Sequence, residues 1–273
     1  GKRGENRHGE SAGRPLASEE MEHQRIPKWI GLPVFSSDAI SSTAYATEEI
    51  LFVTALGASS LALGLSYLVP IAFAVAVLLA IVVFSYRQTI FAYPSGGGSY
   101  IVSRENLGET PSLIAGASLL VDYVLTVAVS ISAGVAAIVS IPTFQGLADQ
   151  RVLPCLGLIV FITVVNLRGA KESGKLFAFP TYIYIVTLGG MVIIGLFRTY
   201  FGHLDPVPFN PERFEGVREI GGSLRLFLLL RGFSSGAVAL SGVEAISNGV
   251  PAFRKPEAKN ASTTLLWMGG ILG

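Results

Sequence analysis

Apolar residues in this chain form runs that are long enough to cross a bilayer, and short polar segments separate them. Because a membrane-spanning helix needs about 20 apolar residues, the pattern predicts six spans and the start of a seventh. The six are Pro33–Leu56, Leu61–Tyr86, Ser112–Ile141, Val152–Asn166, Leu176–Tyr200 and Gly222–Val250. The seventh begins at Thr263 and is still apolar at Gly273, so we expect the chain to be the N-terminal part of a longer protein.

The composition supports an all-α integral membrane fold. Hydrophobic residues make up 51% of the chain and charged residues 14%, which is too apolar for a soluble domain of this length. The net charge of +1 gives no reason to expect a nucleic-acid partner, and the lone Cys155 excludes an internal disulfide and a cysteine metal cage. Residues 1–28 are polar and predict a disordered tail, so the transmembrane domain is expected to cover residues 29–273.

The distribution of Lys and Arg predicts the orientation in the membrane. Most of them lie in the tail and after the second, fourth and sixth spans: Lys2, Arg3, Arg7, Arg14, Arg25, Lys28, Arg87, Arg104, Arg168, Lys171, Lys175, Arg254, Lys255 and Lys259. The opposite side has Arg151, Arg198, Arg213 and Arg218. Because cytoplasmic loops are rich in basic residues, we expect a cytoplasmic N-terminus.

Acidic residues lie inside three of the spans, where charge usually marks a functional path. The first half of span 1 is crowded with Ser, Thr and Asp38, which favours a broken helix that faces protein. Around the break, helical spacing places Asp38, Ser41 or Ser42, and Tyr45 on one face. In span 3, Asp122, Thr126 and Ser130 recur every four residues, with Tyr123 beside them, so their oxygens are expected to form one inward stripe.

Span 6 has the features of an interrupted helix. Ser241 and Glu244 are three residues apart, and Gly236, Gly242 and Gly249 weaken the helix around them. The fragment Glu244–Asn248 also repeats Asp38–Ser42 of span 1 in an acid-Ala-Ile-Ser pattern. Corresponding fragments in two spans are what a transporter made of structural repeats would have, which predicts a site between spans 1 and 6.

Such a collection of oxygens suits a weakly hydrated monovalent cation. Hydroxyls, carbonyls and one or two carboxylates can replace the water that such an ion gives up. Three carboxyl groups around one cation in a low-dielectric site cannot all stay ionised, so at least one can carry a coupling proton. Glu244 and Asp38 are the two candidates, and the sequence does not rank them.

The loop Tyr93–Tyr100, with its Pro-Ser-Gly-Gly-Gly-Ser core, resembles a signature of the amino acid/polyamine/organocation superfamily. The polar segments of spans 1, 3 and 6 are most similar to those of the KUP-related bacterial potassium importers that couple uptake to protons. The resemblance implies five plus five inverted-repeat spans and alternating access. It also implies that the ion path is lined by Asp38, Tyr45, Asp122, Tyr123, Thr126, Ser130, Ser241 and Glu244, with Ser241 where the family usually has Thr.

The same resemblance sets further expectations. The substrates are K⁺ and H⁺, no cofactor is needed, and the protein lies in the cell membrane with several spans. Members of the family form homodimers through a C-terminal cytoplasmic domain that can bind a cyclic dinucleotide. This domain and the later spans are missing from the chain.

Alternatives differ in how they fit the residues. An amino acid permease of the same fold would bind the substrate carboxylate with a glycine-rich break in span 1, whereas span 1 has Ser-Ser-Asp-Ala-Ile-Ser-Ser-Thr, whose Asp38 repels carboxylates. Divalent transition metals would need a soft ligand, and span 6 has no Met, His or Cys. An enzyme is not expected, because the chain lacks a Ser-His-Asp set, a phosphate loop and an HExxH helix, and Gly96–Ser99 predicts a tight re-entrant turn.

Overall fold

A computed structural model describes residues 25–57, 61–167, 169–202 and 225–273. Residues 1–24 of the predicted tail and the loop arginines Arg168, Arg213 and Arg218 lie outside the described residues. The described residues form these elements: α2 (Lys28–Gly57), α3 (Leu61–Ala92), α4 (Gly98–Leu107), α5 (Glu109–Val139), η1 (Pro142–Gln150), α6 (Val152–Asn166), α7 (Ala170–Phe201), α8 (Arg225–Gly236), η3 (Ala237–Leu240), α9 (Ala245–Asn248), η4 (Val250–Ala252) and α10 (Glu257–Leu272).

Several of these helices are suited to a bilayer. In the described part of the chain, four segments are long and apolar enough to cross it: Leu65–Ala92, Glu109–Val139, Lys171–Phe201 and Leu226–Asn248. A fifth is possible if η1 and α6, which meet at 93°, count as one span. Large apolar side chains on α3 and α7 point outward, with Phe73 71% and Phe179 72% exposed. The protein is therefore a multi-pass membrane protein, and the first and seventh predicted spans are helices α2 and α10, which do not belong to these four.

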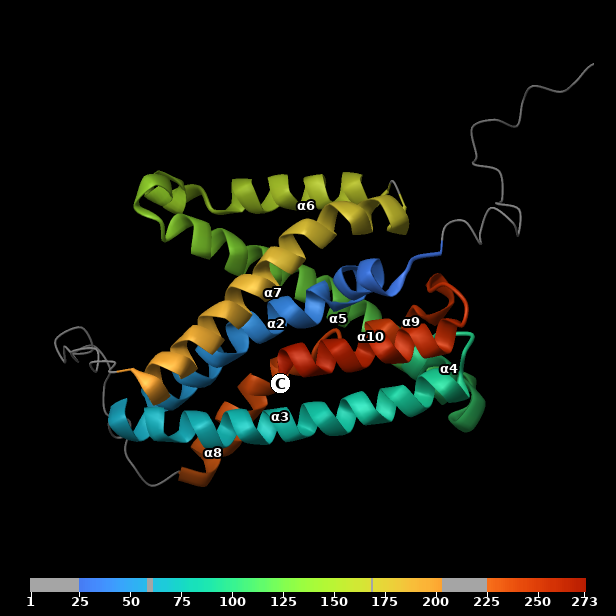
Figure 1. Cartoon of the computed structure of the whole chain (residues 1–273), viewed down its shortest axis with the longest axis horizontal. Coiled ribbons are helices and arrows are strands. Elements are labelled where there is room, and N and C mark those ends of the chain that lie inside the picture. The colour runs from blue at the N-terminus through green and yellow to red at the C-terminus, as the bar shows by residue number, and fades with distance from the viewer. Residues whose placement is uncertain (1–24, 58–60, 168, 203–224) are drawn as a thin grey trace, which may run out of the picture.

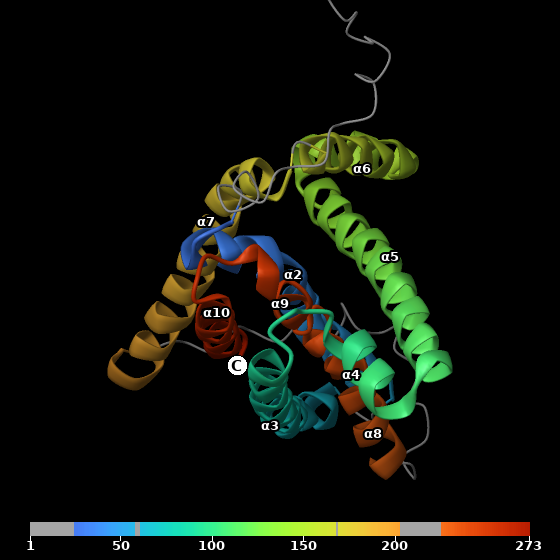
Figure 2. The same cartoon turned by 90° about the vertical axis from the view of Figure 1, so that its right-hand side faces the viewer.

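Helix α2 occupies the centre of the arrangement. It packs against α3, α7, α8, η3 and α10, while α5 and α6 extend to one side (Figures 1 and 2). Helix α6 contacts α5 and α7 and lies away from α2 (Figure 2). The polar face of α2 is thereby placed between the sixth span, made of α8, η3 and α9, and helix α5.

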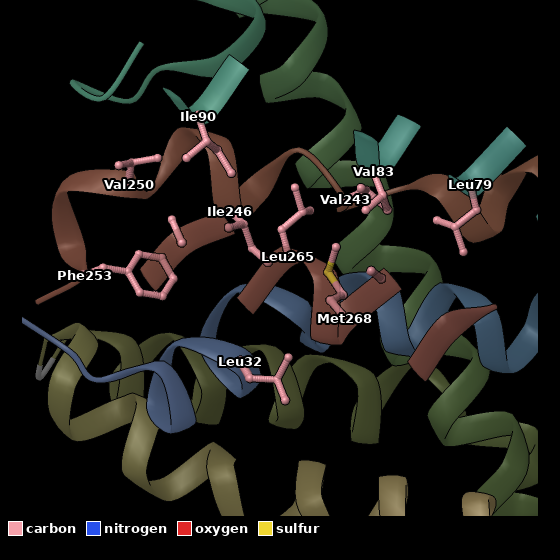
Figure 3. Close-up of a cluster of buried hydrophobic side chains, with 12 residues drawn as sticks. Leu32, Leu79, Val83, Ile90, Val243, Ile246, Val250, Phe253, Leu265 and Met268 are labelled. Carbon is pink, nitrogen blue, oxygen red and sulfur yellow. The ribbon is translucent and has the colours of Figure 1, made fainter. Parts of the chain in front are cut away.

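A buried apolar cluster fixes the sixth span against its neighbours. Ile246 belongs to the sixth span and Phe253 to the segment after it. They pack against Ile90 of α3 and against Leu265 and Met268 of α10, and all five side chains are fully buried (Figure 3). Phe253 also stacks on Phe35 of α2, with ring centroids 5.3 Å apart. Since buried side chains of this size interlock at close packing, the end of the sixth span cannot shift without moving α2, α3 and α10.

The prediction of a broken first span was wrong, because α2 is one helix of 30 residues. Its hydroxyl groups bond back to the helix instead of interrupting it. Ser41 donates to the carbonyl of Asp38 at 2.8 Å, and Thr43 donates to that of Ala39 at 3.0 Å. Hydroxyls that satisfy themselves in this way are compatible with a helix in an apolar environment.

Proline 33 lies inside α2, where the helix accommodates it through a neighbour. A proline has no N–H to donate to the carbonyl four residues earlier, which here belongs to Trp29. The hydroxyl of Tyr182 on α7 donates to this carbonyl at 2.7 Å. The hydrogen bond replaces the missing helical one and joins α2 to α7.

The prediction of a tight turn after the second span is confirmed. Gly96, Gly97 and Gly98 all have positive φ angles, of 78°, 91° and 44°. Residues with a β-carbon rarely adopt this backbone conformation. The turn returns the chain into α4 and brings it against the end of the sixth span, where the N–H of Gly97 donates to the carbonyl of Asn248 at 3.3 Å.

Glu48 and Glu49 lie deep in predicted span 1, so the sequence also suggests that one of them forms a buried structural pair with Arg231 or another cation, and this expectation was wrong. All three side chains are exposed in the structure. Glu48 and Glu49 lie between the buried residues Ala46 and Ile50 of α2 and are themselves exposed. They therefore lie outside the polar group formed by Asp38, Asp122 and Glu244.

Candidate functional site

The sixth span is interrupted at the position that its glycines predicted. Helix α8 ends at Gly236, Ser241 is extended, and Gly242 has a φ of 82° before α9 begins at Ala245. A β-carbon at residue 242 would also lie 2.7 Å from Cγ of Asp38 and 2.8 Å from the backbone nitrogen of Ala39. Glycine is thus required for the backbone conformation and for the close approach of the break to Asp38.

Hydroxyl groups join the break to helix α5. Oγ1 of Thr126 and Oγ of Ser241 are 3.2 Å apart, and Ser241 donates to Oδ2 of Asp122 at 3.4 Å. Because the single hydrogen of Ser241 goes to the carboxylate, Thr126 is the donor to Ser241. The predicted stripe of span 3 therefore faces the predicted hydroxyl of span 6.

Helix α2 also meets α5 through hydroxyls. Oγ of Ser41 and Oγ of Ser130 are 3.0 Å apart. Tyr45 stays on α2, where its hydroxyl lies 3.1 Å from Oγ of Ser42. Ser42 in turn interacts with the carboxyl group of Asp38, so Ser42 connects Tyr45 to Asp38.

Glu244 lies at the start of α9 and is 7% exposed. Its carboxyl group interacts with Tyr123 of α5 and lies within electrostatic reach of Asp38 and Asp122. The side chain of Asn248, one turn later, donates from Nδ2 to the hydroxyl of Tyr123 at 2.7 Å. The three acids predicted from the sequence thus belong to one polar group, in which Glu244 is buried and Asp38 and Asp122 are partly buried, although they come from three separate helical segments.

Four buried oxygen atoms in and near this group accept no hydrogen bond within the described residues. They are Oγ of Ser36, Oδ1 of Asp38, Oε1 of Glu244 and Oδ1 of Asn248. An oxygen left without a donor when buried costs about 1–3 kcal/mol. A cation can satisfy such oxygens, because carboxylate, amide and hydroxyl oxygens are the ligands that alkali ions take in place of water.

A cavity of about 450 Å³ opens beside the group, between α2, α5, α6 and α7. Asp38, Ser41, Tyr123, Thr126 and Ser130 line one side of it. Asn166, Ser173 and Thr181 line the other side. Since a water molecule takes about 30 Å³ of liquid, the cavity has room for a cation with several of its waters.

Sequence reasoning missed four of these polar residues. Asn166, Ser173 and Thr181 are isolated in largely apolar or loop-edge sequence, and no spacing related them to Asp38. Asn248 had a usable signal, since it ends the repeated fragment and lies four residues after Glu244 and seven after Ser241. This is the spacing of one helical face.

A separate ion pair lies at the beginning of the described chain. Arg25 pairs with Glu257, the first residue of α10. Hydrogen bonds from its own backbone N–H and from the Arg25 guanidinium hold the pKa of Glu257 below its usual range. Backbone bonds accompany the pair, from the N–H of Ile26 to the carbonyl of Ala252 at 2.9 Å and from the N–H of Arg254 to the carbonyl of Ile26 at 3.0 Å.

A sequence model described as amino acid permease matches residues 32–273. The chain belongs to the amino acid permease family. The match begins within α2 and includes the glycine turn, the sixth span and α10. The superfamily that was expected from the loop Tyr93–Tyr100 is thereby confirmed.

This permease-family chain is similar to several curated proteins. It is 48% identical to the potassium transporter KimA of Bacillus subtilis (strain 168) over 260 residues, which are 95% of this chain and 41% of the relative. It is 30% identical over 127 residues, 41% of this chain and 17% of the relative, to a protein named probable potassium transport system protein Kup 2 of Bifidobacterium longum (strain NCC 2705). It is 28% identical over 232 residues, 78% of this chain and 37% of the relative, to cationic amino acid transporter 3, mitochondrial, of Arabidopsis thaliana.

The chain spans less than half the length of these relatives. All three are named as transporters or as transport proteins, and the family is named for permeases. At this general level, the family is one of transporters and not of enzymes.

Proposed function

We propose that the protein is a secondary active transporter that imports K⁺ together with protons by alternating access. The observation that carries the proposal is the contact between the carboxyl group of Asp38, on an unbroken α2, and the break at Gly242. The similarity to the potassium transporter KimA supports the same substrate.

The geometry of α2 opposes an amino acid substrate. A permease of this fold would bind a carboxylate with N–H groups that a break in the first span sets free. Around Asp38 the N–H groups of α2 are engaged in a continuous helix. A substrate carboxylate at this position would instead meet three acidic side chains, Asp38, Asp122 and Glu244, of which at least one is ionised.

The cation would be held by oxygens from three segments. Asp38 contributes from α2, Asp122 and Thr126 from α5, and Ser241 and Glu244 from the break and the start of α9. Ser130, Tyr123 and Tyr45 complete the proposed path. Glu244 and Asp38 are the candidates for the coupling proton, because each has a buried carboxyl oxygen without a hydrogen-bond partner in the described residues.

The proposal extends to the architecture of the whole transporter. The chain would supply the first repeat of a five plus five inverted-repeat fold, its sixth span and its seventh. The N-terminus would be cytoplasmic in the cell membrane, as the distribution of Lys and Arg favours. A homodimer formed through a C-terminal cytoplasmic domain, with regulation by a cyclic dinucleotide, is the expected assembly.

The test is uptake of Rb⁺, as a K⁺ surrogate, by the full-length protein in proteoliposomes with an imposed pH gradient. Excess K⁺ should compete, whereas Na⁺, Mg²⁺ and a mixture of amino acids that includes lysine and arginine should not. Asp122→Asn should abolish or greatly weaken uptake. Asp149→Asn, which neutralises an exposed acid of η1, is the matched control. Competition by amino acids would overturn the proposal in favour of a permease.

A further inference from the structure

The far wall of the cavity beside Asp38 is formed by helices α6 and α7 and has no part in the proposed ion path. It contains Asn166 at the end of α6 and Ser173 and Thr181 on α7. Ser173 is buried and Thr181 is half-buried, although large apolar side chains of the same helix are exposed. Two hydroxyls of α7 therefore face the interior, on the side of α2.

The hydrogen atoms of these two hydroxyls are already in use. Oγ of Ser173 donates to the carbonyl of Gly169 at 3.0 Å, and Oγ1 of Thr181 donates to that of Phe177 at 2.8 Å. A serine or threonine hydroxyl has one hydrogen and two lone pairs. Their oxygens can therefore only accept hydrogen bonds from an occupant of the cavity, and the side-chain amide of Asn166 adds a further acceptor oxygen.

The near wall of the cavity has the same property. Ser41 donates to the carbonyl of Asp38 at 2.8 Å, so the 3.0 Å contact between Ser41 and Ser130 uses the hydrogen of Ser130. Thr126 donates to Ser241 in the same way. Hydroxyls from α2, α5 and α7 thus present lone pairs to one cavity, and the carboxyl group of Asp38 adds further acceptors.

Lone pairs on both walls suit a cation that keeps part of its water. A water molecule bound to a cation turns its oxygen toward the ion and its hydrogens outward, so the groups around it must accept hydrogen bonds. Water around an anion has the opposite orientation and needs donors. The cavity volume of about 450 Å³ equals that of about 15 molecules of liquid water, which leaves room for water between an ion and the walls.

Close packing holds the far wall in place against α2. Beside its first hydroxyl, a β-carbon at Gly174 would lie 2.5 Å from Cγ2 of Val34 on α2. Beside its second hydroxyl, Tyr182 donates to the carbonyl of Trp29 on α2 at 2.7 Å. The acceptors are therefore positioned before an ion arrives, and an ion that binds them does not bear the cost of ordering them.

We propose that Asn166, Ser173 and Thr181 form the outer wall of a second cation position, where a hydrated monovalent cation lies between this wall and Asp38. The inference deepens the proposed function and rests on it for the identity of the ion. Water that remains on the ion bonds to the wall, and the ion gives up this water only when the oxygens around the break replace it. The removal of the water shell is thereby divided into two steps.

Replacing the hydroxyl of Thr181 by a methyl group tests the wall. Thr181→Val keeps the outline of the side chain and removes one acceptor, so the Rb⁺ concentration at half-maximal uptake should rise by about five-fold. Thr181→Ser keeps the hydroxyl and should behave like wild type. An unchanged concentration dependence in Thr181→Val, or an equal defect in Thr181→Ser, would overturn the inference.

The same helix offers a matched control. Oγ1 of Thr187 also donates to a carbonyl one turn earlier, that of Ile183 at 2.8 Å, but this side chain is exposed and does not line the cavity. Thr187→Val removes the same type of hydroxyl from α7 and should leave uptake unchanged. A defect as large as that of Thr181→Val would contradict the inference, because both would then follow from a change in the helix itself.

A measurement without transport examines the second position directly. Thr181→Cys is introduced into a full-length variant without other cysteines, which includes Cys155→Ser. It is then labelled with a neutral methanethiosulfonate reagent at increasing K⁺ concentrations. K⁺ should slow the labelling, and Ser173→Ala should raise the K⁺ concentration that halves the rate by about five-fold. Labelling of Thr187→Cys should not depend on K⁺.

The two measurements distinguish a failure of this inference from a failure of the proposed function. If wild type shows no K⁺-competed uptake, the proposed function fails, and protection of Thr181→Cys by K⁺ would still support the second position. If wild type transports K⁺ but labelling is independent of K⁺, only the second position is wrong. If Thr181→Cys does not fold, Ser173→Cys replaces it, with Thr181→Val as the second substitution.

Discussion

Helix α2 and the sixth span contain nearly the same fragment, yet one is continuous and the other is interrupted. Asp38–Ser42 lies inside the continuous helix α2. Glu244–Asn248 instead follows a break and forms the short helix α9 with Glu244 as its N-cap. The difference lies just before the fragments, where α2 has Ser36 and Ser37 and the sixth span has Gly242 and Val243. Hydroxyls and a carboxylate do not break a buried helix by themselves, whereas a glycine at positive φ does.

The two regions therefore contribute in different ways to the proposed ion path. Because α2 is continuous, it holds Asp38 and Ser41 at fixed positions along the helix. Ser41 bonds to the backbone carbonyl of Asp38 and also contacts Ser130 of α5. The interrupted span approaches this surface closely enough to bring Ser241 and Glu244 beside it. The following variants test this division, starting with the largest expected effect.

Gly242→Ala should abolish the close approach of the break to α2. The new β-carbon would meet Asp38 and Ala39 at less than 3 Å and would place an L-residue at positive φ, which costs about 1–2 kcal/mol before any clash. We expect a loss of Rb⁺ uptake of about 100-fold. Gly190→Ala, at a position in α7 with open space around its β-carbon, is the control and should transport normally. Near-normal uptake in Gly242→Ala would mean that the contact with Asp38 is not needed.

Asp38→Asn should remove the charge that α2 presents to the break. A charge-assisted interaction is worth about 2 kcal/mol, so uptake should fall by about 30-fold, mainly through a weaker apparent affinity for the cation. The measurement is the concentration dependence of Rb⁺ uptake, with Asp149→Asn as the control for an acid outside the site. Unchanged affinity would assign α2 a structural role only.

Glu244→Gln should separate cation binding from proton coupling. The amide keeps the shape of the side chain and cannot exchange a proton at neutral pH. Gradient-driven uptake should fall by about 10-fold, while exchange of Rb⁺ for K⁺ without a pH gradient continues. If uptake keeps its wild-type pH dependence, the coupling proton belongs to another group, and Asp38 becomes the first alternative.

Ser241→Thr should have the smallest effect in the series. The hydroxyl that contacts Thr126 and Asp122 is kept, and one methyl group is added at a partly exposed position. We expect less than about a three-fold change in uptake, whereas Ser241→Ala should lose more because the carboxylate of Asp122 loses its donor. The comparison of the two variants measures the hydroxyl, and equal losses would show that packing and not hydrogen bonding matters at this residue.

Most of the helices were predictable from the sequence because membrane spans have a strong and simple pattern. The run Val152–Asn166 has the same bounds as α6, and Ser112–Ile141 differs from α5 by a few residues. The continuity of α2 was not predictable in this way. Whether Ser41 and Thr43 bond to their own helix or interrupt it depends on the surrounding helices, which a one-dimensional pattern does not contain.

The site was predictable where residues follow a helical period. Asp122, Thr126 and Ser130 share one face of α5, and the structure places this face toward the break and α2. Partners contributed by distant segments were not predictable, as with Asn166 and Thr181 across the cavity from Asp38. The expected pairing of Glu48 or Glu49 with Arg231 failed because a position deep in a predicted span was interpreted as burial, although these side chains are exposed.

The short backbone pairing of Ile26 with Ala252 and Arg254 also has a mechanical consequence. It joins the beginning of α2 to the segment that follows the sixth span, and the contact of Asp38 with Gly242 joins them a second time further along. Two attachments along one helix oppose independent rotation and sliding of α2 relative to the sixth span. The connections to α5, in contrast, are side-chain hydrogen bonds, which break at a lower cost than a packed backbone contact.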